Sequence, residues 1–114
     1  MELTVRKLHE KAMLSAELGI VTKHKNKTFQ SRMHFERAMG YERRAAALVP
    51  LAPESEPTRG ILYRSAAWLA MDCGYAAEAK GLAEEGLRGT PPPQIADELR
   101  DVLDAAQKAL ERAP

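Results

Sequence analysis

The sequence predicts an all-α fold built from antiparallel helical hairpins, and three observations favour this class. The chain has 114 residues, of which 45% are apolar, but it holds only two Phe, one Trp and three Tyr, so strand-favouring aromatic residues are scarce. Ala, Leu, Glu, Lys and Arg dominate, and these residues favour helices. No stretch alternates apolar and polar residues for long, as a half-buried strand would. We therefore expect one small domain of packed helices.

The first helix is expected from about residue 2 to 24. Its predicted buried face follows three- and four-residue steps and consists of Leu8, Ala12, Ser15, Leu18, Gly19 and Thr22. A polar turn follows, and Thr28 is the expected N-cap of the next helix because its hydroxyl can accept a bond from a free backbone N–H. These features begin a hairpin over about residues 2–48.

The second helix is expected from about residue 29 to 48. Its apolar residues are Phe35, Ala38, Met39, Ala45, Ala46 and Leu48. Pro50 and Pro53 end it because proline cannot continue a helix. The proline-rich segment at about residues 49–57 is the only predicted linker, and Pro57 is placed in the first turn of the following helix.

The third and fourth helices form a second predicted hairpin over about residues 58–88. The third runs from Thr58 to Asp72 and stops at Gly74, a residue that adopts a left-handed conformation without steric cost. The fourth runs from about Tyr75 to Arg88 and stops at Gly89. Two glycines thus mark the hairpin turn and its end.

The fifth helix is expected at about residues 91–112. Thr90 is its predicted cap, and three prolines fall in its first turn, whose N–H groups have no intrahelical partner to lose. It carries the clearest apolar stripe of the chain, made of Ile95, Leu99, Val102, Leu103, Ala106 and Leu110. Such a one-sided helix is expected to cover an apolar surface.

An internal repeat relates the two hairpins at an offset of 48 residues. Under this offset small residues lie over small ones. It pairs Leu18-Gly19 with Ala66-Ala67, Asn26 with Gly74, Ser31 with Ala79, Phe35 with Ala83, Ala38 with Gly86 and Met39 with Leu87. Small side chains let two helices approach closely where they cross. We therefore expect Gly19, Ala67 and Ala79 at helix crossings.

The repeated pattern resembles the tetratricopeptide repeat, a helix pair of 34 residues with the signature W-x2-L-G-x2-Y, A-x3-F and P. The first unit reads Ser15-x2-Leu18-Gly19-x2-Thr22 and Ser31-x3-Phe35. The second reads Tyr63-x2-Ala66-Ala67-x2-Ala70, Ala79-x3-Ala83 and Pro91. The resemblance implies a short right-handed array of two hairpins, closed by the last helix as a cap. It also implies a protein-interaction module, non-catalytic, with a protein or peptide as its partner.

In such arrays the first helix of each hairpin lines a concave groove. By the alignment, the predicted partner-binding residues are Ile20, Lys23, His24, Arg64, Trp68, Met71 and Asp72. Two interpretations of Trp68 stay open. It packs against the first or fifth helix, or it forms part of an exposed surface of Trp, Met and Arg of the kind that makes binding hot spots.

The sequence offers no support for catalysis or for a cofactor or metal. Ribonuclease-like helical domains carry an arginine followed by four to six residues and a histidine, but Arg6 precedes His9 by three positions and Arg32 precedes His34 by two. There is no phosphate loop and no zinc pattern. Cys73 is interpreted as a small core residue. A degenerate ribonuclease-like domain is the third functional alternative.

Charge is distributed unevenly and defines the second alternative. Residues 1–50 hold ten Lys/Arg against five Asp/Glu, and residues 51–114 hold seven against eleven, so the two parts carry +5 and −4. Either complementary faces meet within the fold, or a basic surface serves an acidic partner. The KHKNK run at 23–27 raises nucleic-acid binding as the rival function, but it lacks interleaved aromatic residues for base stacking.

Compartment and assembly are the remaining expectations. A lone cysteine fits a reducing compartment, and neither a signal-peptide core nor a membrane span is visible, so the cytoplasm is expected. Helical repeats usually need three or more units to bury a continuous core. Because this chain has two units and a cap, we expect a homodimer that covers apolar surface left on the first two helices.

Overall fold

The computed structural model describes residues 1–113 and confirms the all-helical prediction. Its elements are α1 (Leu3–His24), α2 (Thr28–Ala47), a short 3-10 helix η1 (Pro53–Ser55), α3 (Thr58–Asp72), α4 (Ala76–Leu87) and α5 (Pro93–Glu111). The described residues contain no strand. None of their helices combines the length and the apolar character that crossing a membrane requires.

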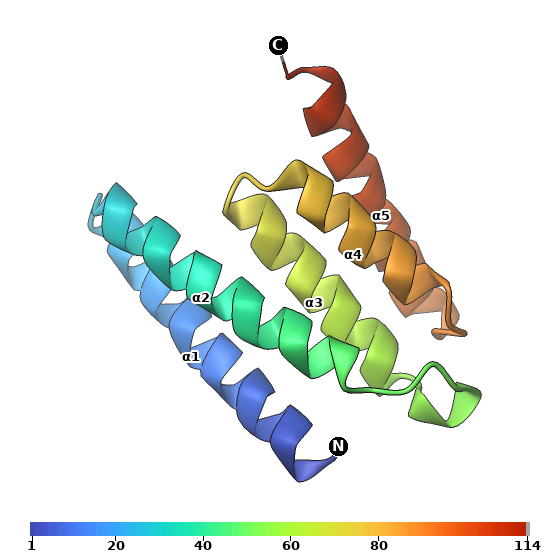
Figure 1. Ribbon diagram of the computed structural model, residues 1–114. Coiled ribbons are helices and arrows are strands. Elements are labelled where there is room, and N and C mark those ends of the chain that lie inside the picture. Colours follow the sequence, from blue (N-terminus) through green and yellow to red (C-terminus); the bar gives the residue numbers. More distant parts are fainter. Residues whose placement is uncertain (114) are drawn as a thin grey trace.

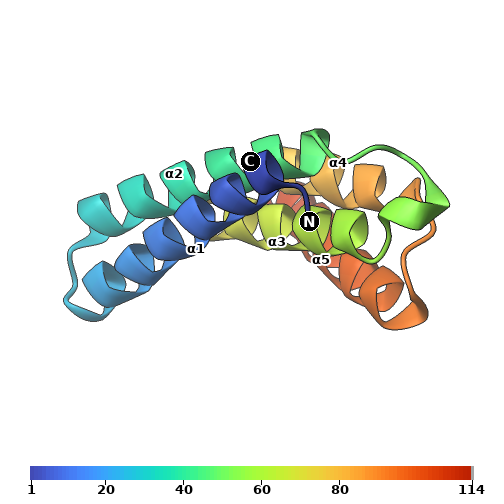
Figure 2. The ribbon, with the colours of Figure 1, turned by 90° about the horizontal axis from the view of Figure 1, so that it is seen from below.

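The helices form a row of two antiparallel hairpins and a closing helix (Figure 1). Helix α2 packs against α1 on one side and α3 on the other, while α5 packs on both α3 and α4. Seen from below, α2 and α4 form one layer and α1, α3 and α5 the other, and the row bends like an arch (Figure 2). The two hairpins therefore meet mainly through α2 and α3, because α1 and α3 hardly touch.

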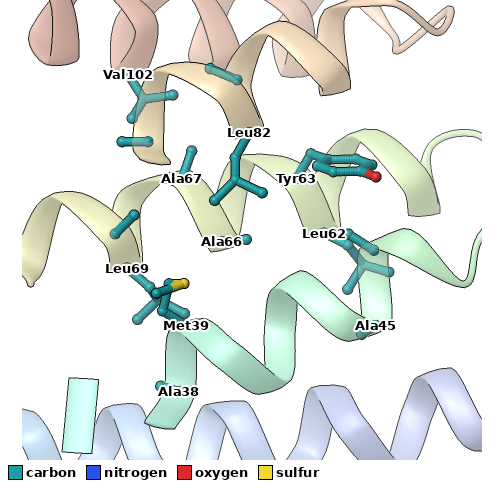
Figure 3. Close-up of a cluster of buried hydrophobic side chains, with 14 of the residues drawn as sticks. Ala38, Met39, Ala45, Leu62, Tyr63, Ala66, Ala67, Leu69, Leu82 and Val102 are labelled. Atoms are coloured by element: carbon teal, nitrogen blue, oxygen red, sulfur yellow. The ribbon is translucent and has the colours of Figure 1, made fainter. Parts of the chain in front are cut away.

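One continuous apolar core runs along this row. Its centre lies between α2, α3 and α4, where Met39, Leu62 and Leu82 meet many small alanines (Figure 3). Leu99, Val102 and Ala106 of α5 are fully buried and extend the core to the end of the row. The predicted stripe of the last helix therefore does cover an apolar surface, except at Leu110, which is 38% exposed.

Small residues lie at both hairpin crossings, as the repeat predicted. A Cβ atom added at Gly19 would stand 3.0 Å from the ring of Phe35. The Ser31 hydroxyl donates a hydrogen bond of 2.8 Å to the Gly19 carbonyl, which joins the two helices at this point. In the second hairpin Ala67 and Ala79 are fully buried. The close approach of the helix backbones thus depends on the absence of larger side chains.

The two hairpin turns share a backbone feature. Asn26 has φ of 60° and Gly74 has φ of 79°, the only positive φ values among the described residues. These two positions are equivalent under the 48-residue offset. Glycine adopts this left-handed conformation freely and asparagine is the side chain that tolerates it best, so both hairpins reverse by the same local device.

Two predicted caps are wrong. Thr28 is the first residue of α2, and the N-cap is Lys27, which provides no side-chain hydrogen bond. Thr90 does not cap α5, because Pro92 is extended with φ of −55° and ψ of 155° and only Pro93 begins the helix. The cap that does form is at Glu2, whose carboxylate accepts bonds from the backbone N–H groups of Thr4 and Val5.

Two leucines that belong to the predicted helix patterns of the first hairpin are exposed. Leu18 is 43% exposed and Leu48 is 54% exposed. One residue along a helix is a rotation of about 100°, so Leu18 points well away from the crossing made by Gly19. Both leucines lie on the flank of the first hairpin that no other helix covers.

Two buried polar clusters escaped the sequence analysis. Glu42 is fully buried, and both its carboxylate oxygens lie 2.9 Å from the Nδ1 atom of His9. Arg59 is 2% exposed, donates a bond of 2.9 Å to Glu85 and lies over the ring of Tyr63. Each cluster joins two helices, and each satisfies a charged group that would otherwise be costly to bury.

Candidate binding cleft

A cleft of about 540 Å³ opens between the two hairpins, near their turns. It is lined by Ala16, Ile20, Lys23 and His24 of α1, Asn26 of the turn, Phe35 of α2, and Leu69 and Asp72 of α3. The cleft exists because α1 and α3 diverge while α2 bridges them. Its lining combines apolar side chains with a cation and a carboxylate, which is the usual composition of a recognition site.

A second depression, of about 590 Å³, adjoins the first. The two share Lys23, Asn26, Phe35 and Asp72, and the second adds Thr28, Ser31, Arg32, Met71, Cys73 and Gly74. Lys23 and Asp72 therefore stand where the two depressions meet. We refer to the two together as the turn cleft.

The charge of Asp72 depends on this position. Partial burial raises the pKa of the Asp72 carboxyl, and the nearby Lys23 ammonium opposes that rise. Both effects follow from placing a carboxylate in a partly desolvated site that holds one cation. The turn cleft thus presents opposite charges side by side.

A polar cluster holds the rim of the turn cleft. The Tyr75 hydroxyl donates a bond of 2.8 Å to Glu36, and Arg32 donates one of 3.3 Å to the same carboxylate. The Arg32 guanidinium also lies 5.4 Å from the centre of the Tyr75 ring. These contacts connect α2 to the start of α4, so they fix the turn of the second hairpin against the first.

The structure brings together five of the seven predicted binding residues. Ile20, Lys23, His24 and Asp72 line the first depression, and Met71 lines the second. Arg64 does not line either one, because its guanidinium donates to Glu98 of α5.

Trp68 is 41% exposed and does not belong to the buried core cluster. It lines neither depression. It belongs to α3, in the same layer as α1 and α5 (Figure 2). The predicted binding surface is therefore divided between the turn cleft and a part that extends along α3.

In the first depression of the turn cleft, sequence reasoning missed Asn26, Phe35 and Leu69 as lining residues. Phe35 and Leu69 could not be recognised as site residues, because each is also a core residue with less than a tenth of its surface exposed. Asn26 carried a usable signal, since the repeat pairs it with Gly74 at the other hairpin turn.

Cys73 is buried, and its burial, with the neighbouring carboxylates of Glu36 and Asp72, raises the pKa of its thiol to about 11. Such a thiol is not a nucleophile at neutral pH. Among residues 1–113, no three His, Cys, Asp or Glu side chains gather where they could hold a metal ion.

Comparison of this chain with protein-family models, with curated proteins and with solved structures finds no match.

Proposed function

We propose that this protein is a non-catalytic interaction module that binds a peptide or an extended protein segment in the turn cleft. The observation that supports it is the open cleft between α1 and α3, where exposed Ile20 adjoins the opposite charges of Lys23 and Asp72. A cleft in the layer formed by α1, α3 and α5 suits the groove binding that the tetratricopeptide resemblance implies.

The lining suggests how a segment is recognised. Ile20 is 50% exposed and offers apolar contact. Lys23 and Asp72 can pair with charges or backbone groups of a ligand, and Asn26 adds a side-chain amide. Apolar contact supplies affinity, and the two opposite charges fix the direction in which a segment lies.

The experiment uses selection of peptides from a displayed random library against the full chain, followed by measurement of binding of a selected peptide in solution. Ile20→Ala should weaken that binding by roughly tenfold, as expected for a contact in a recognition site. Val21→Ala is a matched control, because Val21 is the adjacent residue and is 47% exposed but does not line the cleft. Equal losses in both variants, or in neither, would remove the turn cleft as the site.

We also propose a homodimer and a cytoplasmic location. Phe29 and Met33 lie one turn apart on α2, both are exposed, and Phe29 is the most exposed large apolar side chain of the described residues. Burying this pair against a second copy would remove apolar surface from water. A monomer mass by light scattering at high concentration would rule out the dimer.

The proposed cytoplasmic location rests on the single buried thiol of Cys73, which suits a reducing compartment.

A further inference from the structure

Two stripes follow the outer flank of the first hairpin, on the side away from α3, and all their members are exposed except Tyr41, which is half-buried. Members of each stripe succeed one another at alternating four- and three-residue steps, the spacing at which a helix presents one face to another helix. The α1 stripe consists of Lys7, Lys11, Leu14 and Leu18. The α2 stripe consists of Arg37, Tyr41, Arg44 and Leu48.

The two stripes line one groove. The Lys11 ammonium lies 5.8 Å from the centre of the Tyr41 ring, so the two helices face each other across it. A depression of about 540 Å³ between them is lined by Lys7 and Lys11 on one side and by Arg44 and Leu48 on the other. We call this depression, together with the two stripes, the flank groove. It has no neighbouring helix, because α3 packs on the other side of α2.

The flank groove carries only positive charge. Its four cations are Lys7, Lys11, Arg37 and Arg44, and no Asp or Glu belongs to either stripe. Within residues 1–113 none of these cations forms an ion pair. Of the ion pairs in that range, only Arg43 with Glu78 connects the basic first part of the chain to the acidic remainder. Four of the ten Lys and Arg residues of this basic first part therefore lie in the flank groove without an ion-pair partner among the described residues.

We propose that the flank groove binds an acidic amphipathic helix of a partner protein. The seven-residue spacing of the stripes suits a helical ligand. The chain itself shows the same packing at its other end, where the apolar stripe of α5 lies across α3 and α4. Four unpaired cations around exposed leucines require carboxylates beside an apolar stripe in the ligand.

Two other occupants fit the flank groove less well. A symmetric pair of copies would bring the same basic stripes face to face, and like charges repel. Nucleic acid could bind the cations, but its phosphates make no favourable contact with the exposed leucines. Lys11 also covers the ring of Tyr41, the one aromatic residue of the stripes, so bases cannot stack on that face. The acidic helix uses both the charges and the leucines.

The probe is a synthetic peptide of about three heptads with leucines along one face and glutamates on both sides of it. A control peptide has lysine in place of every glutamate. Binding to the full chain is measured by fluorescence anisotropy. We expect the acidic peptide to bind, with Kd increasing severalfold between about 50 and 200 mM salt because exposed charges are screened. The basic peptide should not bind.

Two pairs of charge-reversed variants locate the site. Lys11→Glu combined with Arg44→Glu should weaken binding of the acidic peptide by at least roughly tenfold. Arg6→Glu combined with Lys27→Glu makes the same change in net charge at exposed residues outside the groove, and should leave Kd within about twofold at moderate salt. Leu14→Ser combined with Leu48→Ser should also weaken binding while leaving the helical circular dichroism unchanged, since both side chains are exposed.

Three results would overturn the proposal. Equal losses in both charge-reversed pairs would indicate non-specific attraction. Tighter binding of a double-stranded oligonucleotide, lost in the Lys11 and Arg44 variant, would assign the groove to nucleic acid. A dimer mass that the same variant abolishes would assign it to a second copy. Ile20→Ala in the turn cleft should not affect the acidic peptide, so this proposal and the proposed function can fail separately.

Discussion

The two hairpins share one plan but differ in what surrounds them. Among residues 1–113, twelve large apolar side chains are exposed, and nine of them lie in residues 1–48. In the second hairpin Trp68 is the only exposed side chain of this kind. It lies between α2 and α5, so neighbouring helices cover it on both sides, whereas the first hairpin has a neighbour on one side only.

This difference shows that burial in a row of hairpins depends on position in the row more than on the repeat pattern. Gly19 and Ala67 occupy equivalent positions under the offset, and both are buried at crossings. Leu18 and Ala66 are also equivalent, yet Ala66 is fully buried and Leu18 is exposed. Equivalent residues at the crossing inside each hairpin are therefore both buried, whereas equivalent residues on the flanks differ in burial. Burial on a flank requires a neighbouring helix, and only the second hairpin has one on both sides.

The largest expected effect contrasts a covered leucine with an uncovered one. Leu62→Ala, at a fully buried position of the second hairpin, should lower the free energy of unfolding by about 2–5 kcal/mol through lost transfer energy and the cavity left behind. Leu14→Ala, at a position of the first hairpin that is 60% exposed, should change it by less than about 0.5 kcal/mol. Urea unfolding measures both. Similar losses would mean that something covers the outer flank.

The next contrast concerns room at the helix crossings. Ala67→Leu should lower the free energy of unfolding by about 1–3 kcal/mol, because three extra carbons have no space beside α4. Ala77→Leu makes the same change at an exposed position of α4 and should be nearly neutral. The midpoint of unfolding in denaturant, measured for both variants and the parent, tests this contrast. An Ala67 variant as stable as the parent would refute the assignment of this residue to a tight crossing.

A smaller effect should be stabilising. Gly40 lies within α2, and a Cβ atom added there meets nothing within 4 Å. Gly40→Ala should therefore raise the free energy of unfolding by about 0.5–1 kcal/mol, since alanine loses less chain entropy in a helix. At Gly86 of the second hairpin an added Cβ atom would stand 2.9 Å from Tyr63, so Gly86→Ala should destabilise. Thermal unfolding of the pair tests this, and a stabilised Gly86 variant would contradict the close packing described for the second hairpin.

The smallest expected effect depends on pH. The pKa of Asp72 is raised in the folded protein by partial burial, so ionisation favours the unfolded chain and Asp72 lowers stability once pH rises above the pKa of the folded form. Asp72→Asn should therefore raise the unfolding temperature slightly at pH 7 and leave it unchanged near pH 3, below the ordinary carboxyl pKa of about 3.9. Lys23→Ala should have the opposite effect at pH 7, because Lys23 stabilises the ionised form. An Asn variant that is less stable at pH 7 would show that the pairing with Lys23 outweighs burial.

Much of the fold was predictable from local patterns. The bounds of α3 follow from Thr58, Asp72 and Gly74, and those of the other helices agree to within a few residues. The tight crossings followed from small residues at a constant offset. What could not be predicted depends on contacts between distant segments: the burial of Glu42 requires His9 from α1, and that of Arg59 requires Glu85 from α4.

The candidate site was predictable in part for the same reason. The alignment to the tetratricopeptide pattern placed Ile20, Lys23 and Asp72 in one groove, and all three line the first depression of the turn cleft. The pairing of Arg64 with Glu98 depends on how α5 crosses α3, which no spacing within one helix specifies. The flank groove was equally hidden, because Leu18 and Leu48 appeared to belong to the core.

The near absence of contact between α1 and α3 has a mechanical consequence. The hairpins are joined along a single line of packing, α2 against α3, supported by the ion pair of Arg43 with Glu78 and the bond from Tyr75 to Glu36. One line of packing works as a hinge: it resists sliding, but it resists rotation about its own axis much less. We therefore expect the angle between the hairpins to change more easily than the packing within each hairpin, and this angle sets the width of the turn cleft. A segment bound there would add a second line of contact and lock that angle.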